Sequence, residues 1–239
     1  MSKTRPIVLL TRPSAGSSQF AEALKARFGE RIEIVISPLQ EIEWLDNGEE
    51  LPEASGLIFT SQNGVLGWNR DKSGQHPTAY SVGPQTTALV ENLGLNAVDC
   101  GGDANALVDH IVGLAPLTPL VHIRGEHARG NIADRLNQAG IETFERIIYR
   151  QKALPTDESF NRVFQSGRIV IAPLFSPRSV GLFMNVLPSE AEPWLAIISA
   201  NAAERVDAKF QRKMMVASAP NREAMLDSIE EILFRLSAS

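Results

Sequence analysis

LVHIRGEHARGNIADRLNQAGIETFERIIYRQ, residues 120–151, is the stretch that decides the fold. It opens with an apolar strand at 120–123 and continues through a basic, glycine-bearing turn at 124–130. Apolar residues then recur at helical spacing over 132–139, a glycine follows where a helix C-cap is expected, and a second strand covers 142–149. This pattern predicts a βαβ unit. Its turn belongs to the carboxyl edge of a parallel sheet, the edge at which such sheets bind ligands.

The amino terminus repeats the same pattern. A strand is expected at 7–10, a turn at 11–16, a helix with an apolar face from Phe20 to Phe28, and a second strand at 32–36. Two downstream motifs also recur. FTSQNGV at 59–65 corresponds to FSPRSV at 175–180, and SVGP at 81–84 corresponds to IISA at 197–200. The spacings are 112, 115 and 116 residues, from Arg12 to Arg124, Ser61 to Ser176 and Gly83 to Ser199. One spacing held across three motifs predicts an internal duplication of about half the chain.

Strands alternate with helices along the rest of the chain, which predicts an α/β fold with parallel, helix-covered sheets. We expect an irregular acidic connection at 39–52, a loop at 69–78 and a second connection at 152–157. One helix is expected to run through Ala202, Val206 and Phe210. Pro173 is unusual for a strand, because proline has no N–H to donate to a ladder.

Length and composition favour a two-lobed cytoplasmic protein. The chain has 239 residues, 44% of them hydrophobic and 21% charged, which is typical of a globular protein. The net charge of −5 and the lack of a basic cluster argue against a nucleic-acid partner. The single cysteine, Cys100, fits a reducing compartment. No apolar run reaches membrane-spanning length and the N-terminus lacks a signal-peptide core, so we expect no membrane association.

The turns after the strands are rich in Thr, Ser, Asn and Gly. Such residues cap helix N-termini, and where the amides stay free they bind anions. Arginines lie in or beside these turns, and an arginine can bind a carboxylate bidentately. Capping and solvated charge remain the simpler interpretation of any single turn, but their number favours an anionic ligand. The arginines are Arg12, Arg124, Arg129, Arg150 and Arg178.

Several common chemistries leave no signature here. There is no GxGxxG after a strand, no phosphate-binding GxxxxGK[ST] and no Gly-x-Ser-x-Gly elbow. The four histidines lack metal-ligand spacing, so we expect no metal. His127 lies in the central turn, where it is either a base or a surface residue. Tyr149, which ends a strand beside Arg150, is either a packed aromatic or a functional phenol.

Taken together and in order, the motifs resemble those of uroporphyrinogen-III synthases. The likeness covers nearly the whole chain and rests on TRP at 11–13, FTSQNGV at 59–65, VGPQT at 82–86, IRGEHAR at 123–129, a strand ending in Tyr149, and FSPRSV at 175–180. It implies two flavodoxin-like lobes joined by a two-stranded hinge. It also implies that residues 1–37 and 151–239 form one lobe, while 40–148 form the other.

The resemblance also implies a reaction. Such an enzyme, a lyase, closes hydroxymethylbilane, a linear tetrapyrrole with eight carboxylates, to uroporphyrinogen III. Ring D is inverted, water is lost, and no cofactor is needed; the proposed route passes through an azafulvene and a spiro intermediate. We expect a monomer. Tyr149 matches the tyrosine thought to assist departure of the hydroxyl. The expected substrate-binding residues are Thr11, Arg12, Thr60, Ser61, Asn63, Gly64, Gly83, Thr86, Arg124, Gly125, Ser176, Ser179, Ser199 and Asn201.

One departure keeps an alternative open. Where the family commonly has Gly-Pro-x-Thr-Ala, this chain has Ser-Ala-Asn-Ala-Ala at 199–203, although Ser199 and Asn201 could supply donors instead. The rival interpretation is a non-catalytic two-lobed binding protein for an anionic small molecule, or a degenerate homologue.

Overall fold

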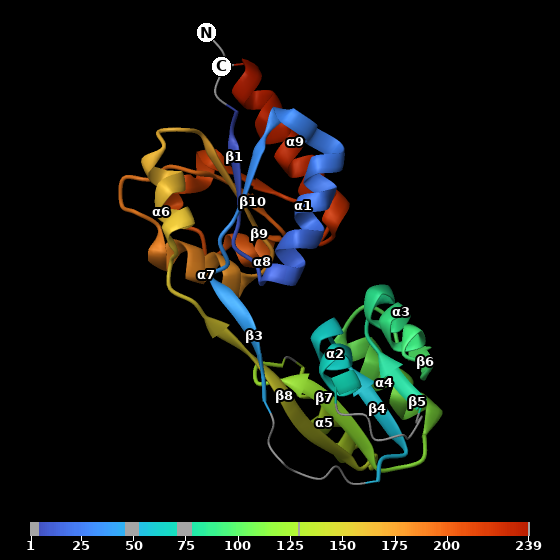
Figure 1. The fold of residues 1–239 in the computed structure, drawn as a ribbon. Coiled ribbons are helices and arrows are strands. Elements are labelled where there is room, and N and C mark those ends of the chain that lie inside the picture. The colour runs from blue at the N-terminus through green and yellow to red at the C-terminus, as the bar shows by residue number, and fades with distance from the viewer. Residues whose placement is uncertain (1–4, 46–52, 71–77, 129, 239) are drawn as a thin grey trace. The chain divides into compact units, whose positions relative to one another are not determined.

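A computed structural model describes residues 5–45, 53–70, 78–128 and 130–238. The chain divides into two compact units. Unit 1 comprises Met1–Glu41 with Lys152–Ser239, and unit 2 comprises Ile42–Gln151. Each unit is an α/β sandwich with a mostly parallel sheet between helices, so the predicted fold class is confirmed (Figure 1).

The sheet of unit 1 is parallel, in the order β11-β10-β9-β1-β2. Its strands are β1 (Ile7–Leu10), β2 (Glu33–Ile36), β9 (Val170–Leu174), β10 (Trp194–Ile197) and β11 (Met214–Val216). All four residues of β1 are buried, because helices cover both faces of the sheet and leave no solvated side.

One face of this sheet packs against α1 (Ser14–Phe28) and α9 (Arg222–Ala238). These two helices lie side by side in Figure 1, and Arg27 of α1 bonds to two carboxylates of α9. The opposite face packs against α6 (Glu158–Gln165), α7 (Pro177–Val186), α8 (Ala200–Ala203) and the 3-10 helix η2 (Ala208–Lys213). A further 3-10 turn, η1 (Gly29–Arg31), follows α1.

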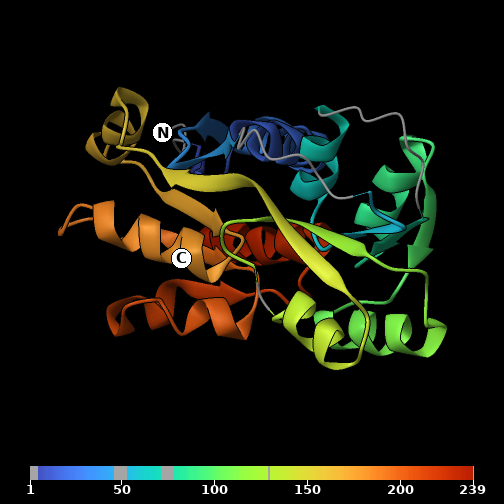
Figure 2. The ribbon, with the colours of Figure 1, turned by 90° about the horizontal axis from the view of Figure 1, so that it is seen from below.

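The sheet of unit 2 has the order β3-β8-β7-β4-β5-β6. Its strands are β3 (Gln40–Trp44), β4 (Gly56–Phe59), β5 (Thr78–Ser81), β6 (Asn96–Asp99), β7 (Leu120–Gly125) and β8 (Thr143–Ala153). Figure 2 shows α2 (Gln62–Arg70) and α3 (Pro84–Asn92) on one face, and α4 (Ala104–Leu114) and α5 (Ile132–Gln138) on the other.

The two sheets share one strand order once sequence position is set aside. The strands of unit 1 are numbered 1 to 5 in the order β1, β2, β9, β10 and β11, and those of unit 2 in the order β7, β8, β4, β5 and β6. Both sheets then have the order 5-4-3-1-2, and β3 is an additional edge strand in unit 2. Each sheet therefore combines the first two strands of one half of the chain with the last three of the other half. The internal duplication stays a prediction, and the matching order agrees with it.

The links between the units are strands rather than irregular loops. Leu45 donates to Ile148 and Leu154 donates to Leu39, so β3 and β8 run antiparallel. The expected irregular connection at 39–52 was therefore wrong over β3, while residues 46–52 lie outside the described part.

Two other expectations need correction, and the position of Pro173 in a strand has an explanation. Residues 69 and 70 end α2 and Thr78 begins β5, so only 71–77 of the expected loop remain, and these lie outside the described part. The helix expected through Phe210 is instead the short α8 followed by η2. Pro173 belongs to β9 and aligns with Ala196 of β10. It is tolerated there because the pairing of β9 with β1 extends only to Ile171.

Candidate functional site

Each sheet has one point at which the strand order reverses. In unit 1 the chain passes from β1 to β2 on one side and builds β9, β10 and β11 on the other, so the reversal lies between β1 and β9. In unit 2 it lies between β4 and β7. Open α/β sheets bind ligands at the carboxyl ends of the strands beside such a point. The expected site residues Thr11, Arg12 and Ser176 lie at this edge in unit 1, and Thr60, Ser61 and Gly125 at the equivalent edge in unit 2.

Ser61 and Tyr149 form the central contact of the unit 2 edge. The Ser61 Oγ lies 2.8 Å from the Tyr149 hydroxyl oxygen. The backbone N–H of Gly64 donates to the same Ser61 Oγ at 3.1 Å, because Ser61 begins the first turn of α2. That bond occupies an acceptor site of Ser61 and favours donation of the serine proton to Tyr149. Tyr149 is only 8% exposed and packs edge-to-face on Trp44, with ring centroids 6.1 Å apart.

Gly125 makes room for the Tyr149 ring. A Cβ at position 125 would lie 2.6 Å from two carbons of that ring and 3.0 Å from its hydroxyl oxygen. The pairing of β7 with β8 shifts register between Arg124 and Gly125, which brings Gly125 opposite Tyr149. The Glu126 N–H then donates to the Tyr149 carbonyl at 2.9 Å. The lack of a side chain at Gly125 thus allows the Tyr149 ring to lie beside Ser61.

A buried histidine on β7, His122, contacts Thr60 at the same edge. His122 on β7 is 1% exposed, and its Nε2 lies 3.3 Å from the Thr60 Oγ1. Its Nδ1 lies 3.7 Å from Glu145 and forms no hydrogen bond. Burial lowers the pKa of His122 to about 4; the Glu145 carboxylate opposes this shift and Arg124 adds to it. His122 is therefore neutral at pH 7 and fixes Thr60 beside Ser61.

Two of the expected arginines, Arg124 and Arg150, form hydrogen bonds within unit 2. Arg124 donates to Glu145 at 2.6 Å and to the carbonyls of Gly125 and Glu126. Arg150 forms a two-bond ion pair with Glu43. Arg124 thus stabilises its own loop and pairs with Glu145. Arg129 lies outside the described residues.

In unit 1 the reversal point is marked by Arg12 and Phe175. The Arg12 Cζ lies 4.1 Å from the centroid of the Phe175 ring, and Phe175 in turn packs edge-to-face on Phe20. Burial lowers the pKa of Arg12 from its ordinary value. Thr11, directly before it, is buried, and its carbonyl accepts from Leu39.

Several expected donors serve as helix caps. Ser176 and Ser179 form a capping box at the start of α7, in which each side chain accepts from the other residue's backbone N–H. Ser199 caps α8, whose four residues place Asn201 on an exposed turn. The capping interpretation therefore accounts for the hydroxyls of Ser176, Ser179 and Ser199.

The remaining expected residues surround α2 and α3. Asn63 is half-buried in the first turn of α2, and Gly64 allows that turn to approach β7, since a Cβ there would lie 2.9 Å from the Ile123 carbonyl. Gly83 begins α3 with a φ of 82° and no side-chain cap. Thr86 is buried one turn later. The starts of the two helices are joined by a Gln62–Gln85 hydrogen bond.

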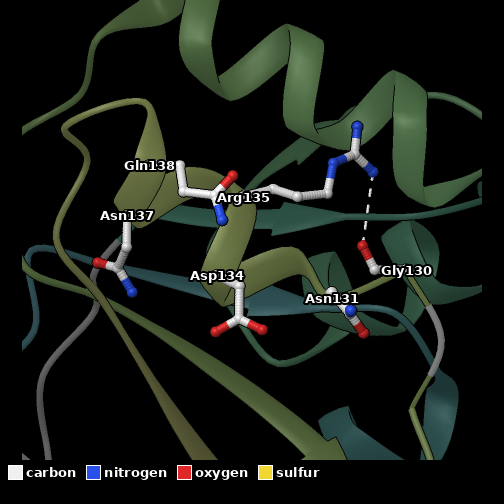
Figure 3. Close-up of a pocket in the computed structure, with 6 residues that line it drawn as sticks. All are labelled: Gly130, Asn131, Asp134, Arg135, Asn137 and Gln138. Atoms are coloured by element: carbon white, nitrogen blue, oxygen red, sulfur yellow. Dashed lines mark hydrogen bonds between the residues drawn. The ribbon is translucent and has the colours of Figure 1, made fainter.

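A surface hollow on unit 2 is a separate feature (Figure 3). It is lined by Gly130, Asn131, Asp134, Arg135, Asn137 and Gln138, along α5 and the loop before it. Two of its polar side chains bond to neighbouring residues: Arg135 donates to Asn105 and the Gly130 carbonyl, and Asn137 bonds to the backbone of Thr143. Neither Ser61 nor Tyr149 lines it, so it does not belong to the candidate site.

Sequence reasoning did not single out His122 or Phe175, although both contact expected site residues. The only available signal for Phe175 was its place at the start of FSPRSV. Within the described ranges no cluster of His, Cys, Asp or Glu is arranged to hold a metal ion. None of the helices in those ranges is long and apolar enough to cross a bilayer.

Fold and candidate site together describe a two-unit α/β protein with polar residues at the carboxyl edge beside the reversal point of each sheet. The sequence matches the family model of uroporphyrinogen-III synthase HemD over residues 18–227. The chain therefore belongs to the uroporphyrinogen-III synthase family, and this membership supports synthase function in haem biosynthesis over a non-catalytic binding role.

Solved structures agree on the fold. Uroporphyrinogen-III synthetase from Helicobacter pylori is 14% identical, with a TM-score of 0.68 over 96% of this chain and 100% of that one. A mutant uroporphyrinogen III synthase from Thermus thermophilus is 13% identical, with a TM-score of 0.52 over 96% and 99% of the two chains. A search of curated proteins found no match.

Proposed function

We propose that this protein closes hydroxymethylbilane to uroporphyrinogen III, with inversion of ring D and loss of water, and that Tyr149 is its general acid. The observation that carries the assignment of Tyr149 is its 2.8 Å hydrogen bond to Ser61 at the reversal point of the unit 2 sheet. Membership in the family supplies the reaction.

The chemistry needs a proton for the departing hydroxyl. In the proposed step the Tyr149 phenol donates its proton as the C–O bond breaks, so water leaves and the N-protonated, cationic form of the azafulvene remains beside the phenolate. The phenolate oxygen keeps the hydrogen bond from Ser61, whose own oxygen accepts from Gly64. The proton later lost from the attacked pyrrole carbon restores the phenol, so the enzyme ends the cycle unchanged. General acid assistance of this kind contributes about 10²–10⁴ in rate.

Backbone amides and caps supply the rest of the proposed site. The uncapped start of α3 at Gly83 and the turn at Thr60 offer N–H and hydroxyl donors at the unit 2 edge. Helix N-termini favour anionic groups, which suits a substrate with several carboxylates. We also propose, from composition and family, a cytoplasmic lyase that works as a monomer without a cofactor.

The test is incubation with enzymatically generated hydroxymethylbilane and separation of the type I and type III products. We expect type III to predominate. Binding of the bilane with type I alone, formed at the uncatalysed rate, would instead identify a binding protein or a degenerate homologue.

A further inference from the structure

Arg12 lies at the unit 1 edge, and helix capping does not explain its position. Its guanidinium rests on the Phe175 ring at 4.1 Å. A Cβ placed on Gly16 would lie 3.3 Å from each of its Cζ, Nε and Nη2 atoms. Equal distances to three atoms of one plane put Gly16 over the face of the guanidinium. Phe175 and the Gly16 backbone therefore hold the Arg12 side chain against the start of α1. Hydrogen bonds can then form only along the edge of the guanidinium plane, where its N–H groups point.

Arg12 also lacks an acidic partner. Across residues 5–45, 53–70, 78–128 and 130–238, no carboxylate lies within ion-pair distance of Arg12, and its guanidinium forms no hydrogen bond. Other arginines of the protein are paired with acidic residues; these are Arg5, Arg27, Arg124, Arg150, Arg162, Arg168, Arg222 and Arg235. A half-buried charge without a counter-ion destabilises the fold, so its position at the edge where such sheets bind ligands indicates that a ligand supplies the counter-ion.

We propose that Arg12, held by Phe175 and Gly16, is a carboxylate-binding site of unit 1 that receives one acidic side chain of the substrate. The planar fork of arginine matches a carboxylate in two parallel hydrogen bonds, and stacking on an aromatic ring pre-organises it. The identity of the natural ligand rests on the proposed function. The carboxylate specificity rests only on the geometry of unit 1.

Gly16→Ala separates this role from a structural one. Gly16 has no left-handed backbone angle, and alanine is a better helix former, so the variant should unfold at a higher temperature than the wild type. The added methyl group also crowds the guanidinium and displaces it. We expect KM for hydroxymethylbilane to rise several-fold in Gly16→Ala and about tenfold in Arg12→Gln, with kcat within twofold of wild type. Arg31→Gln is the matched control, because Arg31 also lies near a phenyl ring but at 5.9 Å and at the opposite end of α1.

An unchanged KM in Arg12→Gln would overturn the inference. A binding measurement without the bilane distinguishes failure of this inference from failure of the proposed function. The 15N chemical shift of the Arg12 Nε is followed during titration with propionate, and during a second titration with chloride at equal ionic strength. A propionate shift that exceeds the chloride shift and is reduced in Gly16→Ala supports the site even if no type III product forms. Equal shifts for the two anions overturn it.

Discussion

Gly125 and Tyr149 oppose each other across β7 and β8 so closely that a Cβ on Gly125 would lie 2.6 Å from the tyrosine ring. We predict that Gly125→Ala forces the ring out of its position beside Ser61. Overpacking of this kind costs about 1–3 kcal/mol in free energy of unfolding. Type III turnover should fall by about a hundredfold or more, which is the loss expected when the Tyr149 hydroxyl itself is removed. Thermal unfolding and product analysis check both effects.

The control for that variant is Gly113→Ala. Gly113 lies in α4, where an added Cβ meets nothing within 4 Å. This change should raise stability by about 0.5–1 kcal/mol, because alanine favours the helix, and should leave turnover unchanged. Full activity of Gly125→Ala would show that the position of the Tyr149 ring is unimportant.

Tyr149→Phe keeps the ring and removes only the hydroxyl. Folding and substrate affinity should change little, while the turnover number should fall by about a hundredfold, the low end for general acid catalysis. Hydroxymethyl pyrroles ionise readily, which is why we expect the low end. Type I product, formed by spontaneous closure, should accumulate instead. Type III formation at the wild-type rate would remove Tyr149 from the mechanism.

Ser61→Ala removes the partner of the Tyr149 hydroxyl and the side-chain bond to Gly64. Loss of one hydrogen bond corresponds to about 0.5–1.5 kcal/mol, so we expect turnover to fall by up to about tenfold. Because Ser61 acts through Tyr149, the double variant with Tyr149→Phe should turn over no more slowly than Tyr149→Phe alone. Additive losses in this cycle would mean that Ser61 acts on the substrate independently.

The buried His122 predicts acid sensitivity of unit 2. Its folded pKa, about 4, lies below the ordinary value of 6.5, so the unfolded chain binds the extra proton first. The free energy of unfolding should therefore fall as pH drops from about 6.5 to 4. The change is roughly 3 kcal/mol, at about 1.4 kcal/mol per pKa unit. The groups that face His122 are Thr60, Glu145 and Arg124.

Denaturant unfolding at several pH values measures this dependence. His122→Gln replaces the imidazole with a side chain that does not titrate, and should flatten the dependence across the same window. An equally steep dependence in the variant would assign the acid sensitivity to other groups.

Local pattern was enough to predict most strands and helices, because apolar periodicity is a property of short segments. It failed at β3, where Ile42 and Trp44 turn toward the core while Glu41 and Glu43 pair with Lys152 and Arg150. The partner strand of β3 is β8, about a hundred residues later, and five alternating residues in an acidic stretch give little signal. The contact of Arg12 with Phe175 was equally hidden, because β1 and β9 come together only in the sheet.

The polar turns were predicted as a set, but their individual roles were not. Ser61 and Ser176 occupy equivalent positions after β4 and β9, yet one meets a phenol and the other closes a capping box. Which role a serine takes depends on the residue that the neighbouring strand brings opposite it. That information resides in the strand pairing and not in the turn itself.

The exchange of strands between the two halves of the chain also affects the order in which each sheet can be completed during synthesis. Unit 2 is one continuous run, so the ribosome delivers all its strands before β9 appears. β1 is synthesised first, but its second edge remains unpaired until Val170 of β9 has been synthesised. A fully apolar strand with an open edge invites association with other nascent chains. Between the synthesis of β1 and that of β9, the edge of β1 that later pairs with β9 is therefore open to such association.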